Sequence, residues 1–177
     1  MNTKIYTSIA IILLALAGIG WFMYSSGGGV SVLGEYVTGG NEVEQESAGE
    51  TQTYTNQSPE FSFEYPAGFT VTSFAEGTGE VVLVQSRDNQ AVGMQVYFTS
   101  FDEEGPLTVE RIKEDLPNLE MNNAREADLF PDTLAVVFRD GSGMVNVWFV
   151  RGGYMYQITA APELGGLFQT MVGSLRF

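Results

Sequence analysis

The sequence predicts an α+β protein, in which a single antiparallel β-sheet of about six to seven strands is flanked by helices and preceded by one N-terminal transmembrane helix. Three observations support this fold class. An uncharged apolar run fills residues 5–24. Short stretches with alternating apolar and polar residues recur between residues 61 and 161, and apolar residues recur at helical spacing in two further stretches. Runs of strands with separate helices are typical of layered α+β domains.

The first segment has the properties of a membrane anchor. Residues 5–24 carry no charge, and a helix of this length spans about 30 Å, the thickness of the hydrocarbon core. Lys4 precedes the run and acidic residues follow it, so the positive-inside rule predicts a cytoplasmic N-terminus and a domain outside the cell membrane. A second interpretation stays open, because Ala15-Leu16-Ala17 is a cleavage pattern and cleavage near Ala17 would release a secreted protein.

A linker is predicted between the anchor and the domain. Residues 25–58 are rich in glycine, serine and glutamate and contain no Lys or Arg. Such a composition buries too little apolar surface to offset chain entropy, which predicts a flexible acidic spacer. In an alternative interpretation, residues 30–37 form a short strand against the domain. The globular domain is then expected over residues 59–177.

The domain is expected to open with an aromatic strand. Phe61, Phe63 and Tyr65 alternate with polar residues, and Pro66 and Gly68 then form a turn. Turns at Asp88-Asn89, Asp140 to Gly143 and Gly152-Gly153 separate later strands. These strands are expected at residues 69–74, 80–87, 91–98, 124–129 (an edge strand), 132–140, 143–151 and 154–161.

Two amphipathic helices are predicted. The first covers residues 108–116, with Thr108 as its N-cap and an end at Pro117. The second follows Pro162, and its regular part begins near Gly166, because two consecutive glycines weaken its first turn. Its apolar face consists of Leu164, Leu167, Phe168, Met171, Val172 and Leu175.

The two ends of this domain resemble a known family. The opening TYTNQSPEFSFEYPAGF and the closing LFQTMVGSLRF are similar to those of the PsbP-like family, and the resemblance covers residues 53–177. It implies an α-β-α sandwich around an antiparallel sheet, and an extrinsic accessory or binding role rather than an enzymatic one. A photosystem role is not carried over, because a membrane span and an acidic linker replace the targeting peptide of the photosynthetic members. The matching residues are Phe61, Phe63, Tyr65, Pro66, Phe69, Ser174, Leu175, Arg176 and Phe177.

Composition removes several classes of function. The formal net charge is -14, with 8 basic and 22 acidic residues, which argues against nucleic acid as a partner. The chain has no histidine and no cysteine, so it has no thiolate nucleophile, no zinc site of Cys and His, and no lipidated cysteine. No catalytic residue and no cofactor are expected.

Two groups of residues are candidates for binding. Asp102, Glu103 and Glu104 offer hard oxygen ligands for Ca²⁺, but they lack EF-hand spacing, and the sequence favours a solvated loop. Trp148, Tyr154 and Tyr156 crowd two adjacent strands and would form a partner-binding patch if one sheet face were open. If both faces are covered, these aromatic residues belong to the core.

The sequence therefore predicts a non-enzymatic, membrane-anchored accessory domain outside the cytoplasm. Its expected partners are the lipid bilayer, through residues 5–24, and a protein outside the cytoplasm. Two alternatives remain: a secreted or anchored hydrolase that uses a pair of carboxylates, and a Ca²⁺-dependent binding module.

Overall fold

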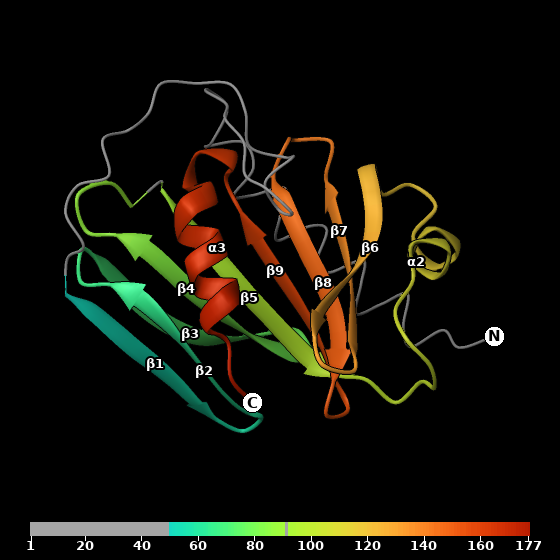
Figure 1. Ribbon diagram of the computed structural model, residues 1–177, viewed down its shortest axis with the longest axis horizontal. Coiled ribbons are helices and arrows are strands. Elements are labelled where there is room, and N and C mark those ends of the chain that lie inside the picture. Colours follow the sequence, from blue (N-terminus) through green and yellow to red (C-terminus); the bar gives the residue numbers. More distant parts are fainter. Residues whose placement is uncertain (1–49, 91) are drawn as a thin grey trace. The chain divides into compact units, whose positions relative to one another are not determined.

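The computed structural model describes residues 50–90 and 92–177 (Figure 1). In these residues the chain is mostly β-sheet, with two α-helices and one 3-10 turn. The strands are β1 (Thr51–Gln57), β2 (Glu60–Pro66), β3 (Phe69–Glu76), β4 (Gly79–Ser86), β5 (Gly93–Ser100), β6 (Asn122–Phe130), β7 (Thr133–Arg139), β8 (Val145–Arg151) and β9 (Tyr154–Ala160). The helices are α2 (Val109–Asp115), η1 (Pro162–Leu164) and α3 (Gly165–Ser174).

Seven strands form one antiparallel sheet in the order β3-β4-β5-β9-β8-β7-β6. This confirms the predicted size of the sheet, and the predicted edge strand is β6, which runs longer than expected. The turn between β8 and β9 is also as predicted, since Gly152 and Gly153 have φ angles of 58° and 78°, and a tight hairpin of this kind needs positive φ at both positions. The layered α-β-α order stays a prediction.

The prediction was wrong about the start of the domain. Residues 51–57 were expected to end the flexible linker, but they form β1, which pairs with β2 as a separate two-stranded sheet. The threonine-rich sequence TQTYTNQ suits a strand, and its side chains Tyr54 and Asn56 lie opposite Phe63 and Phe61. The aromatic strand β2 is therefore the second strand of a hairpin and is not part of the main sheet.

Several predictions lie outside the described residues. These are the transmembrane span at residues 5–24, the cleavage site near Ala17, the short strand at residues 30–37 and the linker before residue 50. Within residues 50–90 and 92–177, no helix is long and apolar enough to cross a bilayer.

The described residues divide into two compact units. The first consists of residues 73–82 and 95–159, and helix α2 packs on its strands β7 and β8. Thr108 caps this helix as predicted, because its Oγ1 accepts a hydrogen bond from the Arg111 amide at 3.2 Å. The buried residues of this cluster are Leu107, Val109, Ile112, Leu116, Val136, Phe138 and Trp148.

A second aromatic group in this unit joins strands β5, β6, β8 and β9. The rings of Phe149 and Tyr156 stack with centroids 5.1 Å apart, and Phe98 lies 6.1 Å from Tyr156. Phe130 meets Phe149 edge to face at 5.9 Å. Burial raises the pKa of Tyr156 to about 12, and the neighbouring Tyr154 adds to this shift while Arg151 opposes it.

The second unit consists of residues 50–72, 83–94 and 160–177. Helix α3 packs on strand β2, and its Ser174 Oγ accepts a hydrogen bond from the Glu64 amide at 2.9 Å. After the helix, Arg176 bridges to Ser62 by two backbone hydrogen bonds of 2.9 Å. The terminal residues that resemble the PsbP-like ending therefore fasten the end of the chain to the β1-β2 hairpin.

Candidate binding site

The acidic loop before α2 does not form a metal centre in the structure. Glu103 pairs with Arg111, while Asp102 and Glu104 are exposed. Among the described residues, no group of three or more acidic side chains lies close enough together to hold a metal ion. The Ca²⁺ hypothesis for Asp102, Glu103 and Glu104 therefore gains no support from the geometry.

The loop from Asp140 to Gly143 is a turn, as its sequence predicts. Asp140 Oδ1 accepts hydrogen bonds from the amides of Ser142 and Met144, at 2.9 and 3.1 Å. Its Oδ2 accepts one from Asn146 Nδ2 at 3.2 Å. The carboxylate is occupied in organising its own loop.

The predicted aromatic patch is not a surface. Trp148 and Tyr156 expose only 3% and 2% of their areas, because Trp148 lies beneath α2 and Tyr156 is stacked on Phe149. Only Tyr154 is partly exposed. The proposal that these three residues bind a partner together is wrong, and the core interpretation holds for Trp148 and Tyr156.

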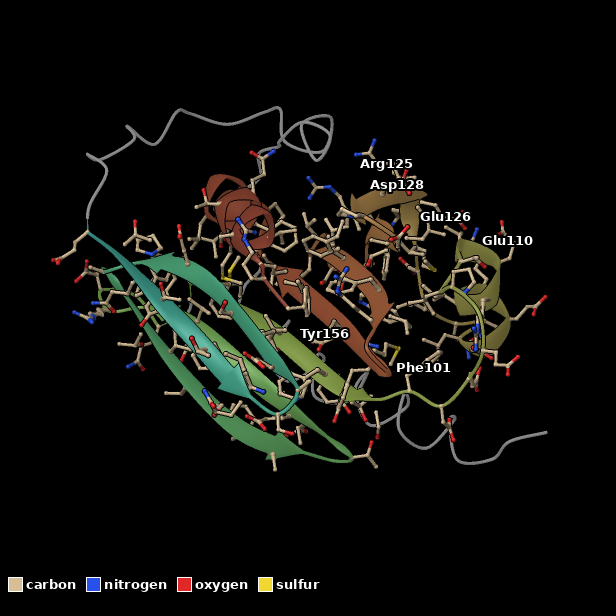
Figure 2. The ribbon with its side chains drawn as sticks, turned by 60° about the horizontal axis from the view of Figure 1, so that its bottom comes forward. Phe101, Glu110, Arg125, Glu126, Asp128 and Tyr156 are labelled. Atoms are coloured by element: carbon tan, nitrogen blue, oxygen red, sulfur yellow. The ribbon has the colours of Figure 1, made fainter. Side chains whose placement is uncertain are left out.

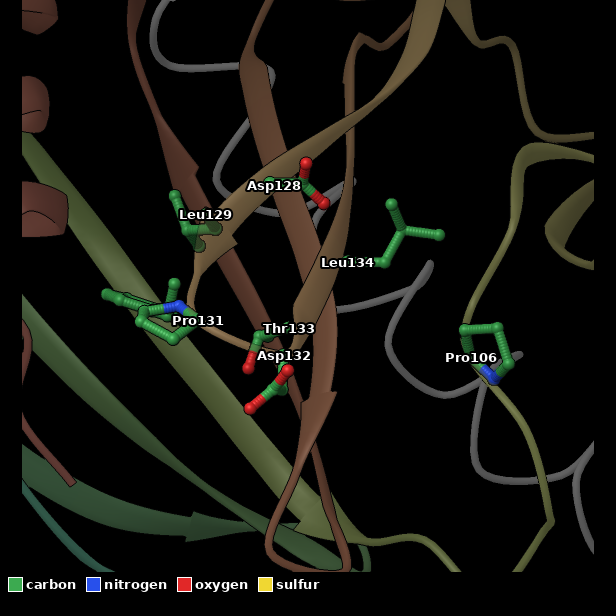
Figure 3. A pocket seen from close by; sticks show the side chains of 8 residues that line it. Pro106, Asp128, Leu129, Pro131, Asp132, Thr133 and Leu134 are labelled. Carbon is green, nitrogen blue, oxygen red and sulfur yellow. The ribbon is translucent and has the colours of Figure 1, made fainter.

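A shallow, largely open hollow of about 650 Å³ lies in the first unit, beside the turn between β6 and β7 (Figure 3). One wall is the β6-β7 hairpin, and the loop that leads into α2 contributes the opposite residue, Pro106. The lining is mixed, with apolar side chains from proline, leucine and phenylalanine beside one threonine and two carboxylates. The lining residues are Pro106, Asp128, Leu129, Phe130, Pro131, Asp132, Thr133 and Leu134.

The local sequence explains the shape of the hairpin wall. Pro131 and Asp132 are the two residues between the strands, and Asp132 has a φ of 62°. Proline presets the first turn position, and aspartate tolerates positive φ better than most residues. The register shifts between Asp128 and Phe130, so an irregularity bends the strand just before the turn.

Arg151, the last residue of β8, holds two of the residues that line the hollow. Its Nη1 donates a hydrogen bond to Thr133 Oγ1 at 2.7 Å, and its guanidinium lies 5.7 Å from the centroid of the Phe130 ring. Thr133 is 96% buried, since only 4% of its area is exposed. A charged donor and a cation–π contact therefore hold the two lining residues on either side of the turn.

Arg111 fixes the opposite wall. Its Nη1 donates to the backbone oxygens of Glu104 and Pro106, its Nη2 pairs with Glu103, and its guanidinium lies 5.0 Å from the centroid of Phe101. The pKa of Asp115 is raised from its ordinary value, chiefly by burial and next by the negative charge of Glu103. The positive charge of Arg111 lowers this pKa but does not cancel the shift. The loop that carries Pro106 is thus tied to α2.

Helix α2 is also tied to strand β6. Glu126 Oε1 accepts a hydrogen bond from the Val109 amide at 3.1 Å, at the amino end of the helix. Glu126 is labelled in Figure 2, together with Glu110 in the first turn of α2. A carboxylate at this position satisfies a free amide and interacts favourably with the helix dipole. Both walls of the hollow are therefore connected to each other through Glu126 and Val109.

The chemistry of the hollow suits a cationic and apolar ligand. Asp128 and Asp132 are exposed, whereas Arg111 and Arg151 already contact Glu103, Thr133, Phe130 and backbone oxygens. Exposed carboxylates accept hydrogen bonds from Arg or Lys, and proline and leucine walls accommodate the aliphatic stems of these residues. No general base paired with a nucleophile lines the hollow.

Comparisons with known proteins give a similarity of fold. No protein-family model matches the chain, and no curated protein matches it. The structure is similar to the solution structure of cyanobacterial PsbP (CyanoP) from Synechocystis sp. PCC 6803, with 14% sequence identity and a TM-score of 0.49. The match covers 77% of this chain and 97% of that chain. Membership of the PsbP-like family stays a prediction.

The sequence did not predict the hollow. Its patterns predicted only an edge strand at residues 124–129 in this region and assigned no role to Arg111 or Arg151. The dipeptide Pro131-Asp132 is a turn signal after an apolar pair, and this signal could have predicted the hairpin. The approach of Pro106 to the hairpin depends on long-range packing and has no local signal.

Proposed function

We propose that this protein is a non-enzymatic accessory protein with a PsbP-like domain. Residues 5–24 anchor it in the membrane, and the domain lies outside the cytoplasm, where it binds a protein partner through the hollow beside the β6-β7 turn. The anchor rests on the uncharged apolar run and the position of Lys4, and the family on the motifs at the two ends of the domain.

One observation carries the binding role: a hollow with walls held by two arginines presents exposed carboxylates beside proline and leucine. A site whose shape is fixed before binding loses less entropy when a partner docks. Asp128 and Asp132 select a basic segment, and the apolar walls select aliphatic neighbours of that segment. The net charge of -14 steers basic partners toward the domain.

Photo-crosslinking in the producing cells tests this proposal. A benzophenone amino acid at Pro131, which is exposed at the hollow, should give an adduct with a protein partner. The variant Asp128→Lys/Asp132→Lys should abolish the adduct, because it reverses both carboxylates. The variant Glu110→Lys/Glu114→Lys makes the same change of charge at exposed positions of α2 and should retain the adduct.

Two results would contradict the proposed site. An adduct that survives reversal of both aspartates would show that the carboxylates do not select the partner. Equal loss of the crosslinked adduct in both double variants would show that the total charge of the chain, and not the hollow, controls binding.

A further inference from the structure

Among residues 50–90 and 92–177, no other strand lies along the outer edge of strand β1 in the second unit. In the described part of the chain, β1 pairs only with β2, so its other side offers free backbone groups. Its seven residues, TQTYTNQ, carry no charge. Edge strand β6 differs, since it carries Arg125, Glu126 and Asp128 together with register irregularities. Charges and bulges are the usual means by which edge strands avoid pairing with other chains, and β1 has neither.

The hydrogen bonds of β2 determine which groups of β1 point outward. The Ala67 amide donates to the Glu50 oxygen, while Ser62 and Glu64 bond away from β1, to Arg176 and to Ser174. Hydrogen-bonded and non-hydrogen-bonded pairs alternate along an antiparallel ladder. The residues of β1 whose amides and oxygens face the open edge are therefore Thr51, Thr53, Thr55 and Gln57.

This outward set is symmetric about Tyr54. We propose that two copies of the chain pair antiparallel through β1, with a twofold axis at Tyr54, and so form a continuous four-stranded sheet. Thr53 of each copy then lies opposite Thr55 of the other, and Thr51 lies opposite Gln57. Each such pair exchanges two backbone hydrogen bonds. This register therefore gives every outward-facing amide and carbonyl of β1 a hydrogen-bond partner.

The side chains of β1 are compatible with this pairing. Thr51, Thr53, Thr55 and Gln57 are all exposed, and facing threonines on neighbouring strands stabilise a sheet. Tyr54 is partly exposed on the other face, with its ring centroid 5.2 Å from that of Phe63, and meets its counterpart at the axis. No pair in this register brings two carboxylates opposite each other.

Charge explains why pairing is expected at a neutral strand. Two copies with a net charge of -14 each repel one another, and an uncharged edge minimises the repulsion at the contact. Salt screens the remaining repulsion. The β1 dimer should therefore tighten as salt is raised, whereas binding of a basic partner to the hollow should weaken, which separates the two proposals.

Variants that introduce charges into β1, in the full chain in detergent, test the dimer. Thr53→Lys/Thr55→Lys and Thr53→Glu/Thr55→Glu each place like charges in two cross-strand pairs, which should weaken self-association about tenfold. An equimolar mixture of the two variants should restore dimers, because opposite charges then face each other. Thr70→Lys/Thr72→Lys, on the exposed residues of edge strand β3, is the matched control and should dimerise like the unaltered chain.

Native mass spectrometry of the three variants and the mixture gives the readout. Three results would overturn the proposal. The unaltered chain could be monomeric, the Thr53/Thr55 variants could dimerise as well as the unaltered chain, or the mixture could stay monomeric. Loss of the dimer in the β3 variant alone would overturn it too, since the contact would then lie at β3. Restoration on mixing also excludes misfolding as the cause of the loss.

Cysteine crosslinking tests the register. The chain has no cysteine, so introduced thiols are unique. A mixture of Thr53→Cys and Thr55→Cys chains should form an intermolecular disulfide, because directly opposed residues lie about 5.5 Å apart between Cα atoms. Thr53→Cys alone should crosslink at least about tenfold more slowly, because its copies are diagonal neighbours, about 7 to 8 Å apart. Equal rates would contradict the register.

Discussion

The contact between Arg151 and Thr133 provides a quantitative test of how the hollow is held. The donor is charged and the acceptor is buried, with 2.7 Å between Nη1 and Oγ1. Such a bond contributes about 1.5 kcal/mol after allowance for the partial exposure of Arg151. The contact with Phe130 adds about 0.5 to 1 kcal/mol. Arg151→Met should therefore lower the free energy of unfolding by about 2 kcal/mol, and Thr133→Val by about 1.5 kcal/mol.

A double-mutant cycle isolates the pair. The double variant should lose about 2 kcal/mol rather than the sum of the single losses, which gives a coupling energy of about 1.5 kcal/mol. Urea unfolding in a Trp21→Phe background measures it, because the buried Trp148 is then the sole tryptophan reporter. Lys113→Met, on an exposed lysine, should change little. A coupling energy below about 0.3 kcal/mol would refute the assigned hydrogen bond.

Three further predictions concern stability. Gly166→Ala should stabilise the chain by about 0.5 to 1 kcal/mol, because nothing lies within 4 Å of the added carbon in α3. Gly79→Ala should destabilise it, because the added carbon would collide with the backbone oxygen of Phe98. Thermal unfolding of the two variants measures both effects. Phe138→Ala should cost about 3 to 5 kcal/mol in urea unfolding, since its fully buried ring packs on Trp148. Because the pKa of Tyr156 is raised to about 12, the folded state keeps the phenol proton to a higher pH than the unfolded chain does. The unfolding free energy should therefore be unaffected by this group below about pH 10 and should fall as the pH rises toward about 12. Tyr156→Phe should make the unfolding free energy less dependent on pH in this range.

Local patterns were sufficient to predict most of the individual elements. The strands β7, β8 and β9, the Gly152-Gly153 turn and the Thr108 cap follow from signals within a few residues, and all are present in the structure. Their physical cause is local, because side-chain period and turn conformation are properties of short segments.

Long-range partners could not be predicted in this way. Strand β1 is polar and looks like part of the linker, and it becomes a strand because β2 supplies the matching backbone groups and rings. The burial of Trp148 depends on where α2 docks, and the hollow depends on how Arg111 holds the loop at Pro106. Tertiary contacts of this kind leave little trace in composition or period.

The position of the domain relative to the membrane is tested most directly by a single thiol. Ser142→Cys places the only cysteine of the chain at an exposed turn between β7 and β8. A maleimide that cannot cross membranes should label this thiol in intact cells, and the labelled chain should stay in the membrane fraction after an alkaline wash. Labelling that occurs only after the cells are lysed would contradict the proposed location outside the cytoplasm.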